Sequence, residues 1–326
     1  MSKRSKAKFE FSSFAKAVAL IVLALVVAIL CVLAIRHGRG NQQAASPEPT
    51  ATVAPVAVPT TEVPTPTPTA TPKGEPEEVT AVPAAQILAA IDEESAYRAI
   101  VGSCSGGGSV IEATSDGGAT WRPFDVSDRL GIGGIQALAA SGNGYGFFLG
   151  FDQADCSAPV AGHTYSAGAE WATATTVPDT LWRIDNEDSQ ILVGPAGTEV
   201  EAPCELAQVA PGGEDLVAGV CTDGSVVRSM DAGASWDQSD PIMGIDALAF
   251  AGESLLAASV EDEECGDGVA VSTLDSSLQA SDLSCAPAED VEAGYTAISS
   301  AADGTLWLMA GDTVLRSADG GGSWDQ

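Results

Sequence analysis

Four octets of similar sequence recur along the chain: TSDGGATW (114–121), TYSAGAEW (164–171), SMDAGASW (229–236) and SADGGGSW (317–324). Three of them share a Ser or Thr, an Asp, a Gly, a second Ser or Thr and a Trp at the same places, whereas the second octet has Ser166 in place of the Asp. A short Asp side chain can accept backbone N–H bonds within its own turn, Gly permits positive φ, and Trp covers a hairpin. The octets therefore predict a repeated hairpin turn rather than a catalytic motif.

The octets resemble the Asp box of the BNR-repeat β-propellers, S/T-x-D-x-G-x-S/T-W, and the strand-like segments VIEAT, VVRSM and VLRSA precede the three complete copies. In that superfamily, which includes sialidase-like and sortilin-like folds, the box joins the third and fourth strands of a blade, on the face opposite the usual ligand site. The resemblance implies a structural role for nine residues. These are Asp116, Gly118, Trp121, Asp231, Gly233, Trp236, Asp319, Gly321 and Trp324.

The spacing of the octets sets the number of blades. Trp121 and Trp324 lie 203 residues apart, and five intervals of about 41 residues match the usual length of a four-stranded blade. Short Val, Ala, Leu and Ile runs broken by Gly, Asp and Ser indicate an all-β fold. We therefore predict a six-bladed β-propeller over residues 85–326, in which the blades at 180–203 and 245–283 lack a box. Seven blades of about 34 residues are the alternative.

A membrane anchor precedes the propeller in this interpretation. Residues 17–35 are uncharged and mostly aliphatic, AVALIVLALVVAILCVLAI, and 19 helical residues cover roughly the ~30 Å hydrocarbon core of a bilayer. Lys and Arg are concentrated in the tail at 1–16, which places this tail in the cytoplasm and the propeller outside the cell. A signal peptide cleaved near Ala44 is the alternative.

The segment between anchor and propeller, residues 36–84, is predicted to be a disordered stalk. Ten prolines occur between positions 47 and 83, interleaved with Thr, Ala and Val. Such a segment favours an extended polyproline II conformation of about 3.1 Å per residue and cannot form a packed core.

Charge and cysteine content limit the partners. After residue 84 the chain has six basic and 39 acidic side chains, a net charge of −33, and no Lys. Because affinity for nucleic acid comes from Lys and Arg that displace counterions, nucleic acid is excluded as a partner.

Six cysteines lie outside the cell in this topology, an even number in an oxidising compartment, and predict three disulfides. A zinc site is disfavoured because the chain has only two His and no C-x-x-C.

Strand register narrows the disulfide pairing. In CELAQVAPGGEDLVAGVC (204–221), a hairpin that turns at 211–214 places Cys204 opposite Cys221. The same construction, centred at Asp275, joins Cys265 to Cys285. The remaining pair falls between second and third strands of adjacent blades. It consists of Cys104 and Cys156.

Because several Asp-box propellers are sialidases, a hydrolase is one hypothesis. The resemblance would imply three arginines that bind the substrate carboxylate, an Asp that acts as the catalytic acid, and a Tyr nucleophile paired with a Glu. It would also imply a Phe/Tyr-Arg-Ile-Pro motif at the start of the domain. The segment Tyr97-Arg98-Ala99-Ile100 lacks the Pro, and Arg228 and Arg316 occupy one repeated position before successive boxes. A strongly negative domain also opposes an anionic sugar. We therefore favour a binding or assembly scaffold for an extracellular protein or glycan, with a sialidase-like or other glycoside hydrolase as the alternative.

Acidic clusters are expected on the face opposite the boxes, in loops between second and third strands and between blades. Such loops can attract a basic partner or bind a hard cation such as Ca²⁺, although a solvated acidic surface is the simpler interpretation. No catalytic residue and no further cofactor is assigned. The candidate binding residues are Asp152, Asp155, Glu261, Asp262, Glu263, Glu264 and Asp267.

Overall fold

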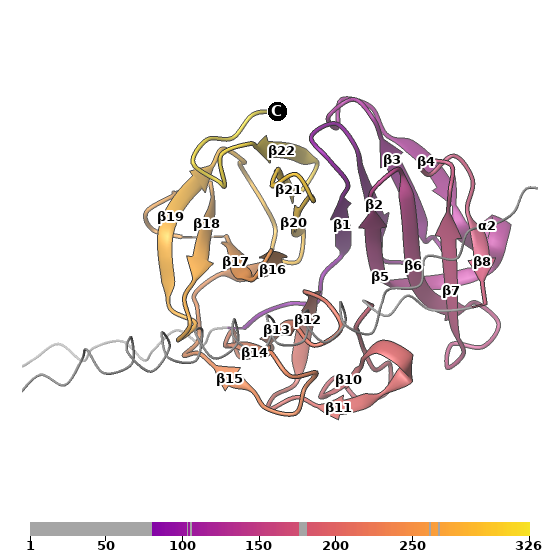
Figure 1. Ribbon diagram of the computed structural model, residues 1–326, viewed down its shortest axis with the longest axis horizontal. Coiled ribbons are helices and arrows are strands. Elements are labelled where there is room, and N and C mark those ends of the chain that lie inside the picture. Colours follow the sequence, from indigo (N-terminus) through magenta and orange to yellow (C-terminus); the bar gives the residue numbers. More distant parts are fainter. Residues whose placement is uncertain (1–79, 103, 105, 176–180, 261, 267) are drawn as a thin grey trace, which may run out of the picture. The chain divides into compact units, whose positions relative to one another are not determined.

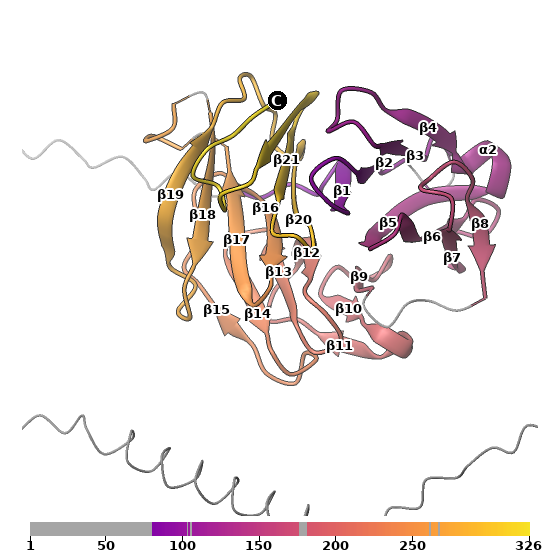
Figure 2. The ribbon, with the colours of Figure 1, turned by 45° about the horizontal axis from the view of Figure 1, so that its top comes forward.

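The computed structural model describes residues 80–326 except 103, 105, 176–180, 261 and 267. The predicted tail, the anchor and most of the stalk, residues 1–79, lie outside the described residues. The described residues form six antiparallel sheets, each made of strands consecutive in the sequence, and Figures 1 and 2 show them as blades around a common centre. The predicted six-bladed propeller is therefore confirmed, and the alternative prediction of seven blades is wrong. No helix in this part of the chain is long and apolar enough to cross a bilayer.

The strands of each blade follow one another from the centre of the ring outward. Blade 1 comprises β1 (Gln86–Ala90), β2 (Ala96–Ile100), β3 (Val110–Thr114) and β4 (Arg122–Asp125). Blade 2 comprises β5 (Ile132–Ser141), β6 (Tyr145–Asp152), β7 (Pro159–Thr164) and β8 (Ala172–Ala174). Blade 3 comprises β9 (Arg183–Ile184), β10 (Ile191–Val193) and β11 (Glu199–Glu201). A short helix, α2 (Val126–Leu130), links blades 1 and 2, and a 3-10 turn, η1 (Pro195–Gly197), links β10 to β11.

The second half of the ring repeats this arrangement. Blade 4 comprises β12 (Leu206–Pro211), β13 (Val217–Cys221), β14 (Val226–Ser229) and β15 (Asp237–Gln238). Blade 5 comprises β16 (Ile245–Ala251), β17 (Ser254–Ser259), β18 (Val269–Leu274) and β19 (Ala280–Ala286). Blade 6 comprises β20 (Thr296–Ser300), β21 (Leu306–Ala310) and β22 (Thr313–Ser317). Beyond β22, an isolated bridge between Arg316 and Asp325 marks the position of a fourth strand.

The middle strands explain why the sequence contains short continuous apolar runs. Every residue of β13 (VAGVC) and of β21 (LWLMA) is buried. Because each blade packs against a neighbour on both faces, a middle strand has no solvent face and needs no polar alternation. The hydrophobic clusters accordingly join residues of adjacent blades, as where Leu256 of blade 5 packs with Ile298 and Leu308 of blade 6.

Blade 3 lacks one strand, and its chain direction is reversed relative to the other blades. Its β9–β10 loop lies beside the β6–β7 loop, where the Asn186 side chain donates to the carbonyl oxygen of Cys156 at 3.3 Å. At the other end, Val200 lies against Gly233 in the box of blade 4. Strands β9 to β11 therefore run in the directions of the second to fourth strands of the other blades, although β9 takes the innermost place, where it contacts β5 and β12, the innermost strands of blades 2 and 4. The sequence predicted a short blade here but not the loss of its first strand.

The ring closes where blade 6 meets blade 1, and among the described residues no strand is exchanged between the two sheets. The Arg316 guanidinium donates to the carbonyl oxygen of Glu93 at 2.8 Å, and the Ala90 N–H donates to the Ser299 hydroxyl at 3.0 Å. Figure 1 shows the yellow blade 6 beside the indigo strand β1. Closure therefore rests on packing and on hydrogen bonds across the seam between these two blades.

Candidate functional site

The three complete boxes use their Asp side chains within their own hairpins. In the last box, Oδ1 of Asp319 accepts the N–H of Ser323 and the hydroxyl of Ser317, both at 2.8 Å, and Oδ2 accepts the Ser323 hydroxyl at 2.8 Å. Asp116 and Asp231 accept the equivalent three bonds at 2.6 to 2.9 Å. Each carboxylate thus uses three of its roughly four acceptor sites within its own turn, which leaves it little capacity for substrate chemistry.

The incomplete box shows which part of the motif the turn needs. The Ser166 hydroxyl oxygen accepts the N–H of Glu170 at 2.9 Å, as an Asp carboxylate does in the complete boxes, and the hydroxyl donates back to the Glu170 carbonyl oxygen at 3.2 Å. Gly168 donates its N–H to the Thr164 hydroxyl at 3.2 Å, again as in the complete boxes. A serine therefore supports the same turn with fewer accepted bonds.

The glycines and tryptophans of the boxes tie each blade to the preceding one. Positive φ values of 89°, 83° and 99° at the three box glycines lie in the left-handed region that favours Gly. Trp121 packs against the cluster that contains Trp307 and Met309 of blade 6. The box glycines are Gly118, Gly233 and Gly321. Trp236 and Trp324 occupy the places in blades 4 and 6 that Trp121 occupies in blade 1.

Hydrogen bonds lower the pKa of all three box carboxyls. Bonds from Ser323, the backbone N–H first, lower the pKa of Asp319 to about 2 from an ordinary value of 3.8. The hydroxyl of Thr120 lowers the pKa of Asp116, and that of Ser235 lowers the pKa of Asp231. The boxes are therefore ionised at neutral pH, and we name the face of the ring that bears them the box face.

All three disulfides lie on the opposite face, which we name the disulfide face. Cys104 in the β2–β3 loop is bonded to Cys156 in the β6–β7 loop, so this bond joins blades 1 and 2. The second and third bonds stay within blades 4 and 5. They are Cys204–Cys221 and Cys265–Cys285. In an antiparallel blade the loops after the second and fourth strands share one edge, and all six cysteines lie there. The predicted pairing is confirmed.

The strand register at two of these pairs differs from the predicted register. Cys221 lies opposite Leu206, because a bulge interrupts β12 between Leu206 and Gln208 and the hairpin turns at 212–216 rather than 211–214. Cys285 lies opposite Ala270, so Cys265 reaches it from the β17–β18 loop and not from a paired strand position. Their partners, Cys204 and Cys265, lie a few residues outside the ladders, where the chain is still close enough to form a disulfide.

The predicted acidic residues that the structure describes lie on the disulfide face, in two groups on different blades. Asp152 and Asp155 belong to the β6–β7 connection of blade 2, where the Asp155 carboxylate accepts the N–H and hydroxyl of Ser157 at 3.1 and 2.8 Å. The second group lies in the β17–β18 loop of blade 5 and consists of Asp262, Glu263 and Glu264. Glu261 and Asp267 lie outside the described residues. Among described residues no three His, Cys, Asp or Glu side chains converge to hold a metal ion.

A further acidic loop was missed by the sequence analysis. Asp185, Glu187 and Asp188 form the β9–β10 loop, which lies beside the Cys104–Cys156 disulfide through the bond from Asn186 to Cys156. It extends the acidic group of blade 2 onto blade 3. The run DNED was visible in the sequence, but its face could not be assigned while blade 3 was expected to start with a normal first strand.

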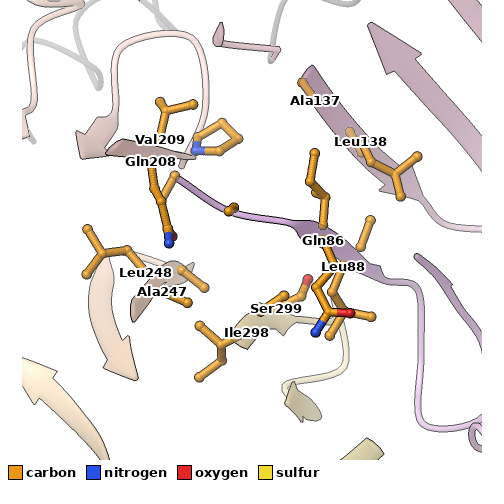
Figure 3. A pocket seen from close by; sticks show the side chains of 18 of the residues that line it. Gln86, Leu88, Ala137, Leu138, Gln208, Val209, Ala247, Leu248, Ile298 and Ser299 are labelled. Atoms are coloured by element: carbon orange, nitrogen blue, oxygen red, sulfur yellow. The ribbon is translucent and has the colours of Figure 1, made fainter. Parts of the chain in front are cut away.

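A channel of about 450 Å³ lies between the inner strands of the blades. Figure 3 shows Leu88, Leu138, Leu248 and Ile298 around it, with Gln86 and Gln208 at its edge. None of the described residues that line it is charged. The glutamine side chains join neighbouring blades, since Gln208 donates to the carbonyl oxygen of Asp246 and Gln86 donates to that of Tyr295.

The arginines do not converge at this channel. Arg98 is paired with Glu112 at 2.6 Å and its guanidinium stacks over Trp121 at 4.3 Å. Arg228 donates to carbonyl oxygens of Asp275 and Ser276 in the next blade. The remaining arginines contact other partners, namely Ala167 for Arg122, Glu170 for Arg129, Asp185 for Arg183 and Glu93 for Arg316. The described residues thus show no group of three arginines at the channel.

No protein-family model and no curated protein matches the chain. Among solved structures, YCF48 bound to D1 peptide is similar with 19% identity, coverage of 77% of this chain and 67% of that chain, and a TM-score of 0.28. The streptogramin B lyase structure has 12% identity, coverage of 78% and 84%, and a TM-score of 0.42. A mutant of Aleuria aurantia lectin in complex with Fucalpha1-6GlcNAc has 10% identity, coverage of 76% and 96%, and a TM-score of 0.46. Similarity at this level of identity concerns the fold and not the function of these proteins.

Proposed function

We propose that this protein is a membrane-anchored, extracellular propeller of the Asp-box (BNR-repeat) family that acts as a binding or assembly scaffold. It binds a protein or glycan partner through its disulfide face. The observation that carries the proposal is that all three disulfides restrain the loops of one face. Loops already held in one conformation lose little entropy on binding, which favours recognition by the pre-organised surface.

The charge of the disulfide face supports the same proposal. Exposed carboxylates gather on blades 2, 3 and 5, in loops that contain Asp155, Glu187 and Glu263. Surface carboxylates of one sign raise the encounter rate with a basic partner and repel acidic ones. The box carboxylates, in contrast, are engaged by their own hairpins, as in Asp319 with Ser323. Exposed carboxylates such as Glu93 and Glu214 also lie in loops of the box face, so the disulfides, rather than charge alone, distinguish the two faces.

The anchor is part of this proposal. Residues 17–35 have the length and hydropathy of a single span, and residues 36–79, the part of the predicted stalk outside the described residues, hold the ring away from the bilayer. Protease added to intact cells should release the propeller while an epitope tag placed before residue 17 stays protected. Loss of the tag without permeabilisation would contradict the topology, and recovery of the ring in the medium of untreated cells would favour signal-peptide cleavage.

A matched pair of variants tests the binding face. Glu263 and Glu253 are both exposed glutamates of blade 5, the former on the disulfide face and the latter in the β16–β17 turn on the box face. The full chain, displayed on cells, is probed with a glycan array and with surface proteins of the same cells. Glu263→Arg should weaken capture of a partner, and Glu253→Arg should not. Equal effects would contradict the proposal, and turnover of a fluorogenic sialoside would favour the hydrolase instead.

A further inference from the structure

The last residues of the predicted stalk lie on the ring rather than away from it. Residues 80–85, which we name the strap, cross the disulfide face from blade 4 to blade 1, and Figure 3 shows this segment running from beside Gln208 to Gln86. Pro83 and Ala84 of the strap line the channel. The strap therefore covers part of the channel mouth on the face that we assign to the partner.

The strap is held by a few hydrogen bonds to three blades. The Ala81 N–H donates to the carbonyl oxygen of Thr222 at 3.0 Å, and the Ala85 N–H donates to that of Gly294 at 2.8 Å. The Val101 N–H in turn donates to the Ala85 carbonyl oxygen at 3.1 Å. The Val101–Ala85 bond continues the β1–β2 ladder, in which Gln86 lies opposite Ile100. From Ala84 back to Thr80 the strap is outside any ladder, and there it is held by the Ala81 bond and by the Gln208 side chain, which donates to the Val82 carbonyl oxygen at 3.5 Å.

One side chain of the strap is buried. Ala81 is 7% exposed and packs in the cluster between blades 4 and 5, with Ala207 and Leu248 among its neighbours. Thr80 and Pro83 on the same strap are exposed. The buried methyl group contributes only about 1 kcal/mol of hydrophobic stabilisation. Val82, Ala84 and Ala85 are half-buried, so the apolar contact of the strap with the ring is small compared with that of a blade strand.

The contact site, or seat, of the strap is held in place by hydrogen bonds within the blades. The Asp246 carboxylate accepts the N–H of Gly294 at 2.5 Å and that of Thr296 at 3.0 Å, which fixes the Gly294 carbonyl toward Ala85. A Cβ on Gly294 would lie 2.9 Å from the Pro83 carbonyl oxygen, so the strap passes very close to the ring here. The acceptors and the Ala81 pocket belong to the blades and remain in place when the strap leaves.

We propose that the strap is a cis-acting gate, which leaves its seat without unfolding the ring and thereby uncovers the channel mouth. The seat then presents the carbonyl oxygens of Thr222 and Gly294, the Val101 N–H and a pocket for one small apolar side chain. This arrangement fits an extended peptide segment with an Ala-sized residue at the pocket. The inference that such a segment comes from a partner rests on the proposed function, whereas independent opening of the strap does not.

Native-state hydrogen exchange of the full chain tests the gate without any partner. The amides of Ala81, Ala85 and Val101 should exchange through a local opening, far faster than the amide of Val220 in the centre of blade 4. Ala81→Asp, which places a charge in the pocket, should accelerate exchange at Ala85 and Val101 at least tenfold and leave Val220 unchanged. Thr80→Asp adds the same charge at an exposed neighbour and should behave like the wild type.

A second variant covers the case in which a charge at position 81 damages the ring. Pro83→Gly changes an exposed residue and increases the freedom of the open strap, so exchange at Ala85 should rise roughly two- to fivefold. If the strap amides exchange only together with Val220, in the wild type and in both variants, the strap is an integral part of the ring and the gate is refuted. That result would leave the binding face itself untouched.

Discussion

The indole N–H of Trp307 in blade 6 donates to the backbone carbonyl oxygen of Asp92 in blade 1 at 2.8 Å, and this bond crosses the seam where the ring closes. Trp307 is fully buried, and its ring also lies beneath the Arg316 guanidinium at 5.6 Å. A propeller without an exchanged strand depends on such contacts, because among the described residues no strand ladder joins its first and last sheets.

Removing this bond should weaken the whole ring. Trp307→Phe leaves the Asp92 carbonyl oxygen without its partner and should lower the free energy of unfolding by about 1–2 kcal/mol. Trp324→Phe is the control, since the indole nitrogen of Trp324 is buried without a hydrogen-bond partner. Urea denaturation of both variants measures the difference. Equal losses would show that the seam bond contributes nothing specific.

The boxes should rank in stability by the number of bonds that their acidic or hydroxyl side chains accept. Asp231 accepts three bonds from Ser229 and Ser235, whereas Ser166 has a single oxygen for the same turn. Asp231→Ala should therefore lower Tm by a few degrees, and Ser166→Ala should lower it by less. Calorimetry of the two variants decides, and a larger effect at Ser166 would contradict the assigned roles.

Acid should destabilise the protein through the boxes. The pKa of Asp319 in the folded state is about 2, below its ordinary value of 3.8. A carboxyl with a depressed pKa stabilises the fold above the unfolded-state value, and this stabilisation is lost as the pH falls from about 4 toward 2. Asp319→Asn should therefore flatten the decline of Tm in this range. An unchanged slope would mean that other carboxyls control acid unfolding.

The three disulfides should contribute unequally. The Cys104–Cys156 bond closes 52 residues, against 17 for Cys204–Cys221 and 20 for Cys265–Cys285. Loop-closure entropy assigns about 4 kcal/mol to the longest loop and about 3 kcal/mol to each of the others. Paired Cys→Ser variants, compared by denaturant midpoint, should show the greatest loss for the first. Non-reducing peptide mapping that paired Cys204 with another cysteine would overturn the assignment.

Local chemistry explains why the blades could be predicted from the sequence. The octet is a self-contained turn, so its copies reveal themselves within eight residues, and Trp spacing then counts the blades. The disulfide partners were found because hairpin arithmetic tolerates a few residues of error, although the bulge before Gln208 was invisible. The strap was missed because Ala81 contacts Thr222, and no local pattern reports a contact over that distance. The shortness of blade 3 was predicted, but its strands of two or three residues are too short for their directions to be read from an apolar pattern.

Site-specific photo-crosslinking in cells tests whether the partner binds the disulfide face. A photoreactive residue is placed in the full chain at Glu263 on the disulfide face or at Glu253 on the box face, both exposed positions of blade 5 without hydrogen-bonded side chains among the described contacts. Binding at the disulfide face predicts a discrete crosslinked species from position 263 and none from position 253. A crosslink from position 253 with none from position 263 would contradict it.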